Sequence, residues 1–359
     1  MKRFRCLDRF ALGLCILILS TSWLGADTGA TSEPASAAKT REAFLAIIDR
    51  PKVDLAAEAK LEGVDVGILR YHFTYASQAD VRVPGLILMK QELTGDGKRH
   101  PAVIAMHGTG QAKESNLPLL RQLAEKGFIA VAIDGRYHGQ RGNQADYNAA
   151  IARAFEGGGA HPLYYDTVWD AMRLIDYLQS RPDIDPHRIG VIGFSKGGIE
   201  TWLTAAADPR VAVAVPCIGV QSFHWALEND AWHERVGTFK KGFAAAAKSA
   251  GVETPDAAFT RRFYDKVLPG IYDRFDGPVM LTLICPRPLL TINGQTDKLN
   301  PLPGLKLATD AAESAYTAAG ASDHFHWIIE PKTGHKVTPD ATGKAVEWFE
   351  KWIGDGSKR

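Results

Sequence analysis

The sequence predicts an α/β protein in which a mostly parallel sheet of about eight strands carries helices on both faces. From residue 101 on, short apolar runs of strand length alternate with helical patterns. The apolar runs lack the polar alternation of a strand with one face in water, as expected where helices cover both faces. The composition, 45% hydrophobic and 23% charged over 359 residues, fits a globular chain with a large core.

The predicted elements ahead of residue 101 are a short helix and a pair of strands. Residues 41–48 fit a helix that ends before Pro51, because the residue before a proline disfavours helical backbone. Residues 64–75 and 81–89 alternate between apolar and polar side chains. That period is typical of strands with one buried face, so we expect an antiparallel pair.

Six apolar runs after residue 101 are the remaining expected strands. They cover residues 102–106, 128–133, 189–194, 211–216, 288–293 and 325–330. Parallel strands need long crossovers, which are usually helical. Two helices are predicted by apolar residues that share one face: Val168, Met172, Ile175 and Leu178 in the first, and Ala345, Phe349, Trp352 and Ile353 in the last.

One connection between these strands is much longer than usual. Residues 221–281 lie within it and combine helical patterns with many aromatic side chains. We predict that they form a helical cap insertion over the carboxyl edge of the sheet. Open α/β sheets bind their ligands at that edge.

The N-terminus has the pattern of a secretory signal peptide. Basic residues come first, the apolar run from Phe10 to Leu19 follows, and small residues come next. We predict a signal peptide over residues 1–26, an N-terminal extension over 27–63 and a catalytic domain over 64–354. The apolar run is short for a membrane span, so we expect a secreted or periplasmic protein without stable membrane association after cleavage, the alternative being an uncleaved anchor.

The charge balance gives no case for a nucleic-acid partner. The formal net charge is +1, and residues 1–26 hold four basic side chains and one acidic side chain, so their removal leaves −2. The remaining cysteines are Cys217 and Cys285, which we expect to be free, buried thiols at opposite edges of the sheet. Two cysteines without adjacent histidines do not predict a zinc site, and we expect neither a metal nor an organic cofactor.

The segment from Gly193 to Gly198 reads Gly-Phe-Ser-Lys-Gly-Gly and contains the pattern G-x-S-x-G. A strand-like run precedes it and a helix-like run follows. A serine on such a tight turn projects its hydroxyl above the sheet edge, so Ser195 is the predicted nucleophile. The alternative is a glycine-rich turn in which the serine only caps the helix.

A serine nucleophile needs a histidine base and an orienting carboxylate, in the chain order serine, acid, histidine. Asp297 follows the strand 288–293 on a loop at the expected edge, although it also fits a turn aspartate before Pro301. Of the later histidines, His324 and His326 begin or occupy a strand, whereas His335 lies in a loop. We therefore predict His335 as the base, the alternative being a surface histidine.

The developing negative charge on the substrate needs two backbone N–H donors. The amide of Lys196, at the start of the helix after Ser195, is one candidate. The other comes from the loop that reads His-Gly-Thr-Gly from residue 107. We predict the amide of Thr109, with Gly108 and Gly110 as alternatives, and a structural role for His107.

Taken together, these motifs resemble the α/β-hydrolase superfamily, and especially its acetyl xylan esterase, dienelactone hydrolase and prolyl-oligopeptidase-like branches. The matching segments are residues 107–110, 134–139, 193–197, 286–290 with Asp297, and 334–335. Dienelactone hydrolases use a cysteine nucleophile, prolyl oligopeptidases carry a large N-terminal propeller, and glucuronoyl esterases place arginine after the serine. This chain differs in each respect.

The resemblance implies a serine hydrolase that acts on esters through an acyl-enzyme. We expect a carboxylesterase whose partner is a small-molecule or carbohydrate ester, for example an acetylated sugar. A peptidase or amidase with the same triad and a hydrolase-like binding protein without catalysis are the alternatives.

Four further side chains are candidates for substrate binding. Arg136 and His138 lie in a loop at the catalytic edge, and Trp225 and Trp232 lie in the predicted cap. Arg136 equally fits a structural ion pair. The two tryptophans equally fit the core of the cap.

Overall fold

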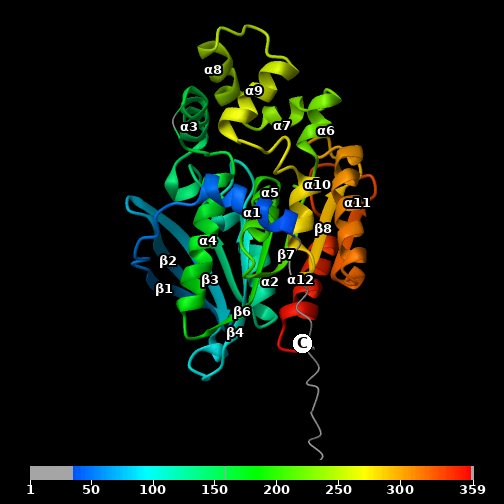
Figure 1. Cartoon of the computed structure of the whole chain (residues 1–359). Coiled ribbons are helices and arrows are strands. Elements are labelled where there is room, and N and C mark those ends of the chain that lie inside the picture. The colour runs from blue at the N-terminus through cyan, green and yellow to red at the C-terminus, as the bar shows by residue number, and fades with distance from the viewer. Residues whose placement is uncertain (1–34, 158, 357–359) are drawn as a thin grey trace, which may run out of the picture. The chain divides into compact units, whose positions relative to one another are not determined.

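The computed structural model describes residues 35–157 and 159–356, and in them nine strands form one sheet (Figure 1). The order across the sheet is β1-β2-β3-β5-β4-β6-β7-β8-β9. The strands are β1 (Glu58–Asp65), β2 (Ile68–Gln78), β3 (Val81–Lys90), β4 (His100–Met106), β5 (Ile129–Ile133), β6 (Ile184–Phe194), β7 (Val211–Cys217), β8 (Leu289–Gly294) and β9 (Phe325–Glu330). From β5 to β9 all neighbours are parallel, and β1, β2 and β3 join in antiparallel pairs. The predicted fold class is confirmed.

The expected strand over residues 64–75 is in fact two strands. Val66 and Gly67 both have positive φ angles, 47° and 73°, and form the tight turn between β1 and β2. Positive φ angles at both turn residues are typical of the two-residue turns that join the strands of a β-hairpin. The sequence did not predict β1 as a separate strand because all eight of its residues are exposed, so it carries no apolar pattern.

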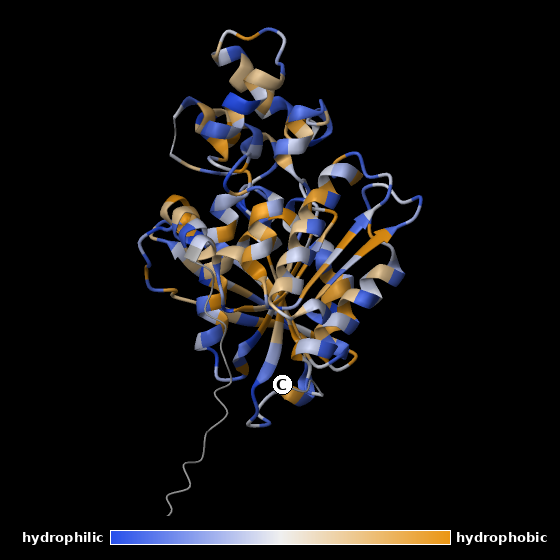
Figure 2. Cartoon of the chain, turned by 45° about the vertical axis from the view of Figure 1, so that its right-hand side comes forward, coloured by the Kyte–Doolittle hydropathy of each residue, from blue (hydrophilic) through white to orange (hydrophobic). Residues whose placement is uncertain are grey.

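Helices cover both faces of the sheet, as predicted. One face packs against α4 (Tyr165–Ser180), α5 (Lys196–Ala207) and α11 (Leu302–Ala318), and the other against α2 (Leu117–Glu125) and α12 (Pro339–Ile353); α1 (Ala35–Ile48) packs on α4 and α5. Figure 2 shows hydrophobic residues along the central strands and hydrophilic ones on the outer surfaces and loops. Successive residues of β4 belong to opposite faces, because side chains alternate along a strand.

The long connection between β7 and β8 forms a group of helices at one end of the sheet (top of Figure 1). They are α6 (Phe223–Glu228), α7 (His233–Gly237), α8 (Lys240–Ser249) and α9 (Ala257–Val267), followed by α10 (Gly277–Met280) on the way back to the sheet. Helix α3 (Gln144–Glu156), which precedes Ser195 in the chain, packs against α8 and α9. The cap therefore includes a second segment that the sequence did not reveal.

Some predictions concern residues that the structure does not describe. The signal peptide over residues 1–26 and the first part of the extension lie outside the described residues. Within residues 35–157 and 159–356, no helix combines the length and apolarity needed to cross a membrane. The limits of the catalytic domain stay a prediction, and residue 64 lies inside β1.

The two cysteines in the described part of the chain are both free thiols, as expected. Cys217 ends β7 and is fully buried. Cys285 is only half-buried, which corrects the expectation of two buried thiols. It lies in the turn before β8 rather than inside a covered strand.

Candidate active site

Ser195 lies at the junction between β6 and α5, on the sharp turn that the motif predicts. Its φ angle is 56°, a left-handed backbone that is uncommon for a residue with a side chain. The amide of Ser195 donates a hydrogen bond of 3.0 Å to the carbonyl of Cys217 on the neighbouring strand. Strained backbone of this kind is typical of functional turns, where the surrounding structure holds it in place.

Glycines on both sides of Ser195 make this turn possible. A Cβ atom at Gly193 would lie 2.2 Å from the carbonyl oxygen of Gly197. A Cβ atom at Gly197 would lie 2.3 Å from the carbonyl oxygen of Met106 on β4. Both distances are shorter than real contacts of this kind, so only glycine lets the first turn of α5 approach the strands this closely.

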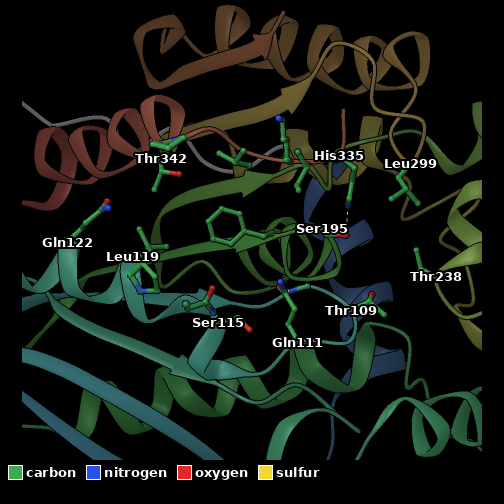
Figure 3. Close-up of a pocket in the computed structure, with 18 of the residues that line it drawn as sticks. Thr109, Gln111, Ser115, Leu119, Gln122, Ser195, Thr238, Leu299, His335 and Thr342 are labelled. Carbon is green, nitrogen blue, oxygen red and sulfur yellow. Dashed lines mark hydrogen bonds between the residues drawn. The ribbon is translucent and has the colours of Figure 1, made fainter. Parts of the chain in front are cut away.

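The three residues of the predicted triad meet at the carboxyl edge of the sheet. His335 Nε2 lies 2.7 Å from Ser195 Oγ, and His335 Nδ1 lies 2.8 Å from Asp297 Oδ2. Figure 3 shows His335 pointing down to Ser195, with the hydrogen bond drawn as a dashed line. These are the contacts that a serine nucleophile, its base and an orienting acid require.

Asp297 is held ionised inside the protein. Its side chain is fully buried, and its oxygens accept hydrogen bonds from the amide of Leu299 (2.9 Å) and the side chain of Asn300 (2.8 Å). Burial alone would raise the pKa of Asp297, but the hydrogen bond and charge of His335 and the other donors lower it below its ordinary value. The carboxylate can therefore orient the histidine and stabilise its protonated form.

The loop after β4 is folded around the carbonyl of Gly108. This oxygen accepts hydrogen bonds from His107 Nδ1 (2.8 Å) and the amide of Gln111 (3.2 Å). The Gly108 carbonyl and the Thr109 N–H belong to one planar trans peptide and point in opposite directions, so fixing the carbonyl also fixes the N–H. The Gly108 amide already donates to Gln111 Oε1 (3.0 Å), which favours Thr109 over Gly108 as an oxyanion donor.

His107 has a structural place in this loop, as expected. The amide of Gly135 donates a hydrogen bond of 2.9 Å to His107 Nε2, so the proton of the neutral ring is on Nδ1. Burial and the nearby Lys196 lower the pKa of His107 to about 4. The ring therefore stays neutral near pH 7 and joins the loops that follow β4 and β5.

Lys196 points its side chain into the protein. Its Nζ lies 2.5 Å from Glu200 Oε1 one turn along α5, and both side chains are almost fully buried. Burial raises the pKa of Glu200 to about 7, although Lys196 opposes this shift. The backbone amide of Lys196 is at the first position of α5, where an N–H has no partner within the helix.

Ser195 lines a cleft of about 800 Å³. Gln111, Ser115 and Thr109 lie below Ser195 in Figure 3, and Leu119 and Gln122 extend the cleft along α2. Thr238 comes from the cap and Thr342 from α12. Lys336 is the one lysine, arginine or acidic residue among those that line the cleft in the described part of the chain.

Sequence reasoning missed the neutral polar residues of this cleft, such as Gln111, Gln122 and Gln144. In the chain they come after β4 and β5, whose carboxyl ends form the edge where a ligand is expected. That position in the sequence could have identified them as candidates. Asn300, which supports Asp297, was also missed, although it lies only three residues beyond it.

The four other candidates for substrate binding do not line the cleft. Arg136 forms a two-pronged ion pair with Asp170 (2.8 and 2.9 Å), which is the structural alternative considered for it. His138 is buried, and burial lowers its pKa to about 3. Trp232 is buried against His233 in the cap, and half-buried Trp225 lies against Gly304.

No group of three or more histidine, cysteine or acidic side chains in the described ranges is arranged to hold a metal ion.

The sequence model of the family described as "Acetyl xylan esterase (AXE1)" matches residues 47–241, which is more than half of the chain. The chain belongs to the acetyl xylan esterase family. It is therefore a carboxylic ester hydrolase with the α/β-hydrolase fold, and the predicted superfamily is confirmed.

Relatives of this acetyl xylan esterase family member agree in sequence and in fold. YitV of Bacillus subtilis (strain 168), whose name marks it as an esterase, is 28% identical over 280 residues, covering 76% of this chain and 96% of YitV. The acetyl xylan esterase from Paenibacillus sp. R4 is 19% identical with a TM-score of 0.64, covering 90% of this chain and 96% of its own. Acetyl xylan esterase 1 from Thermoanaerobacterium sp. JW/SL YS485 is 20% identical with a TM-score of 0.62, covering 88% and 93%.

Proposed function

We propose that this protein is an exported carboxylesterase that removes short acyl groups, foremost acetyl, from carbohydrate esters. Ser195 is the nucleophile, His335 the base and Asp297 the acid that orients it. The observation that carries the proposal is the pair of hydrogen bonds from the two nitrogens of His335, 2.7 Å to Ser195 Oγ and 2.8 Å to Asp297 Oδ2.

In the first half of the reaction, His335 Nε2 accepts the proton of Ser195 as Oγ attacks the ester carbonyl. The amides of Lys196 and Thr109 hold the negative oxygen of the tetrahedral intermediate. Protonated His335, stabilised by Asp297, then gives its proton to the departing alcohol. The acyl group is left on Ser195 as an ester.

In the second half, a water molecule takes the place of the alcohol. His335 accepts a proton from this water as it attacks the acyl-enzyme, and the same two amides hold the second intermediate. Collapse of that intermediate returns the proton to Ser195 Oγ and frees the carboxylic acid. Every proton in this cycle passes through His335 Nε2.

The chemistry of the cleft supports a neutral substrate rich in hydroxyl groups. Amide and hydroxyl side chains line it, among them Gln111, Gln122 and Ser115. Such groups both donate and accept hydrogen bonds, as sugar hydroxyls do. Apolar side chains, including Phe194 and Ile218, line other parts of the same cleft and suit a short acyl group.

Export rests on residues 1–26, whose sequence has the pattern of a signal peptide. Expression of the full chain in a bacterial host and N-terminal sequencing of the mature protein would test it. A start after Ala26 or Ala37, in the periplasm or medium, would support export. An intact N-terminus in the cytoplasm would contradict it.

Replacing the nucleophile tests the catalytic assignment. Ser195→Ala should lower kcat on p-nitrophenyl acetate and on acetylated xylo-oligosaccharides by about 10³-fold or more, with an unchanged melting temperature. Ser314→Ala, an exposed serine of α11, is the matched control and should be fully active. Turnover by Ser195→Ala at the level of the control would refute the assignment.

The peptidase or amidase alternative is tested on the same preparation. Matched ester and amide substrates with one acyl group should differ strongly in kcat/KM, in favour of the ester. Faster cleavage of the amide would replace the proposed function by the alternative. A fluorophosphonate probe that labels the wild-type chain but not Ser195→Ala would show that the nucleophile is active in either case.

A further inference from the structure

A second pocket lies at the same edge of the sheet but shares no lining residue with the catalytic cleft. It has a volume of about 460 Å³ and lies between the end of β2, the start of β3 and the loop after β5. Its lining residues are His72, Thr74, Asp80, Val81, Arg82, Pro84, Arg136, Tyr137, Gln140 and Arg141. We call it the arginine pocket.

Two of its three guanidinium groups share a single carboxylate. Arg136 binds Asp170 through two hydrogen bonds, and Arg141 Nη1 lies 2.8 Å from Asp170 Oδ2. Burial would raise the pKa of Asp170, but Arg141 and Arg136 hold it below its ordinary value. Ionised Asp170 neutralises one of these two cations, and Asp166, the other carboxylate that acts on Arg136, is itself paired with Arg50 (3.0 Å), so a positive charge is left in excess.

This excess charge is poorly hydrated. The side chains of Arg136 and Arg141 are only 12% and 8% exposed, and Asp170 is fully buried. A buried charge without an equal counter-charge is costly, and a bound anion would remove that cost.

The third guanidinium group adds to the positive charge. Arg82 at the start of β3 donates from Nη1 to the carbonyl of Ala56 (2.8 Å) and from Nη2 to the hydroxyl of Thr74. Exposed Asp80 is the one acidic residue in the pocket lining. Three guanidinium groups thus face two carboxylates, Asp80 and Asp170, and the pocket is positive.

Several guanidinium N–H groups remain available to a ligand. Within the described residues, Arg136 Nη1, Arg141 Nη2 and Arg82 Nε take part in none of the hydrogen bonds of these side chains. Guanidinium groups recognise carboxylates through paired N–H donors of this kind. Tyr137 and Gln140 add neutral hydrogen-bonding groups, and Val81 and Pro84 add apolar surface.

We propose that the arginine pocket binds a sugar-sized organic anion whose carboxylate is held by the unpaired guanidinium donors. The volume is more than a bare ion needs, because one water molecule occupies roughly 30 Å³ of liquid. Pockets for small molecules begin at about 300 Å³. The hydroxyl, amide and apolar groups suit the rest of a carboxylated sugar ring.

The arginine pocket and the catalytic cleft take lining residues from the same short segment of the chain. Gln140 lines the pocket, and Gln144, at the start of α3, lines the cleft. The carboxylated ligand is thus bound close to the esterase site without occupying it. Binding does not depend on the triad, so it can be measured in a protein that lacks the nucleophile.

Titration calorimetry on Ser195→Ala at low ionic strength is the direct test, with D-glucuronate as the ligand and D-glucose as its neutral counterpart. Glucuronate should bind saturably and glucose should not. Added salt should weaken binding, because it screens charges. Comparable binding of both sugars, or binding of inorganic phosphate but not of glucuronate, would overturn the proposal.

Variants locate the site. Arg82→Gln in the same background should weaken glucuronate binding by about fivefold or more, and Asp80→Asn should strengthen it. Asp80→Asn removes a pocket acid at an exposed position, so it remains informative even if Arg82→Gln fails to fold. Arg153→Gln on exposed α3 surface and Gln122→Ala in the catalytic cleft are the controls and should bind as before. Loss of binding in Gln122→Ala, or unchanged affinity in both pocket variants, would refute the site.

Discussion

Asn300 donates a hydrogen bond of 2.8 Å from its side-chain amide to Asp297, three residues earlier in the chain. The same nitrogen donates to the carbonyl of Ile218, and the side-chain oxygen of Asn300 accepts from Arg235 (2.7 Å). Asn300 thus connects the loop that carries Asp297 with the loop after β7 and with the cap. It fixes the carboxylate that orients His335.

Removing this amide should weaken catalysis without abolishing it. Asn300→Ala leaves one oxygen of buried Asp297 with a donor fewer, so the pKa of Asp297 should rise and His335 should be oriented less well. We expect kcat to fall by about tenfold or more, with a small change in KM. Such a fall corresponds to the free energy of about one hydrogen bond to a charged group. Steady-state kinetics between pH 5 and 9 would measure it, and an unchanged kcat would exclude this positioning role.

Catalysis should be equally sensitive to Gln111, which holds the loop after β4 in place. Gln111→Ala removes the acceptor of the Gly108 amide, and the peptide that carries the Thr109 N–H loses a constraint. The expected result is a fall in kcat of about tenfold with little change in stability. Gln179→Ala, which removes a similar side-chain contact to backbone at the end of α4, is the control. Equal kcat values for the two variants would contradict the role of Gln111.

How much of this site the sequence predicts differs from residue to residue. That Ser195, Asp297 and His335 lie in contact was predictable, because the proposed chemistry demands an order along the chain and few residues satisfy it. The strand β1 could not be predicted as a separate strand, because its exposed residues carry no apolar pattern. The ion pair of Arg136 was considered from the sequence, but its partner Asp170 could not be named, since it lies on a helix 34 residues further along the chain.

The turn at Ser195 should not tolerate a methyl group. In Gly197→Ala the new Cβ would collide with backbone atoms of Met106 and His107, which cannot move aside as a side chain can. We expect a loss of about 2 kcal/mol or more in the free energy of unfolding, together with a loss of activity. Gly237→Ala, where a Cβ meets no atom within 4 Å, should be neutral or slightly stabilising in the same urea titrations.

Stability should fall in acid because of buried neutral histidines. The unfolded chain protonates His107 near pH 6.5, whereas the folded chain does so only near pH 4. Between these values the unfolded state binds more protons, so the free energy of unfolding decreases as pH falls, by up to about 3 kcal/mol from this group. His138 acts in the same direction.

Urea titrations at pH 7, 6, 5 and 4.5 would measure this loss. In His107→Asn the free energy of unfolding should depend less steeply on pH, by up to the slope that one bound proton produces. The variant should also be less stable at pH 7. Parallel curves for the variant and the wild-type chain would show that His107 does not contribute.

The cap is made from two separate segments, and this limits how it can be exchanged. Gly242 of α8 donates its amide to the side chain of Asn148 on α3 (2.8 Å), and Phe155 of α3 packs against Phe259 and Phe263 of α9. Grafting a cap from a relative onto this chain would therefore require the exchange of α3 together with residues 221–281. A graft of the later segment alone would leave the apolar side of α3 facing a foreign surface.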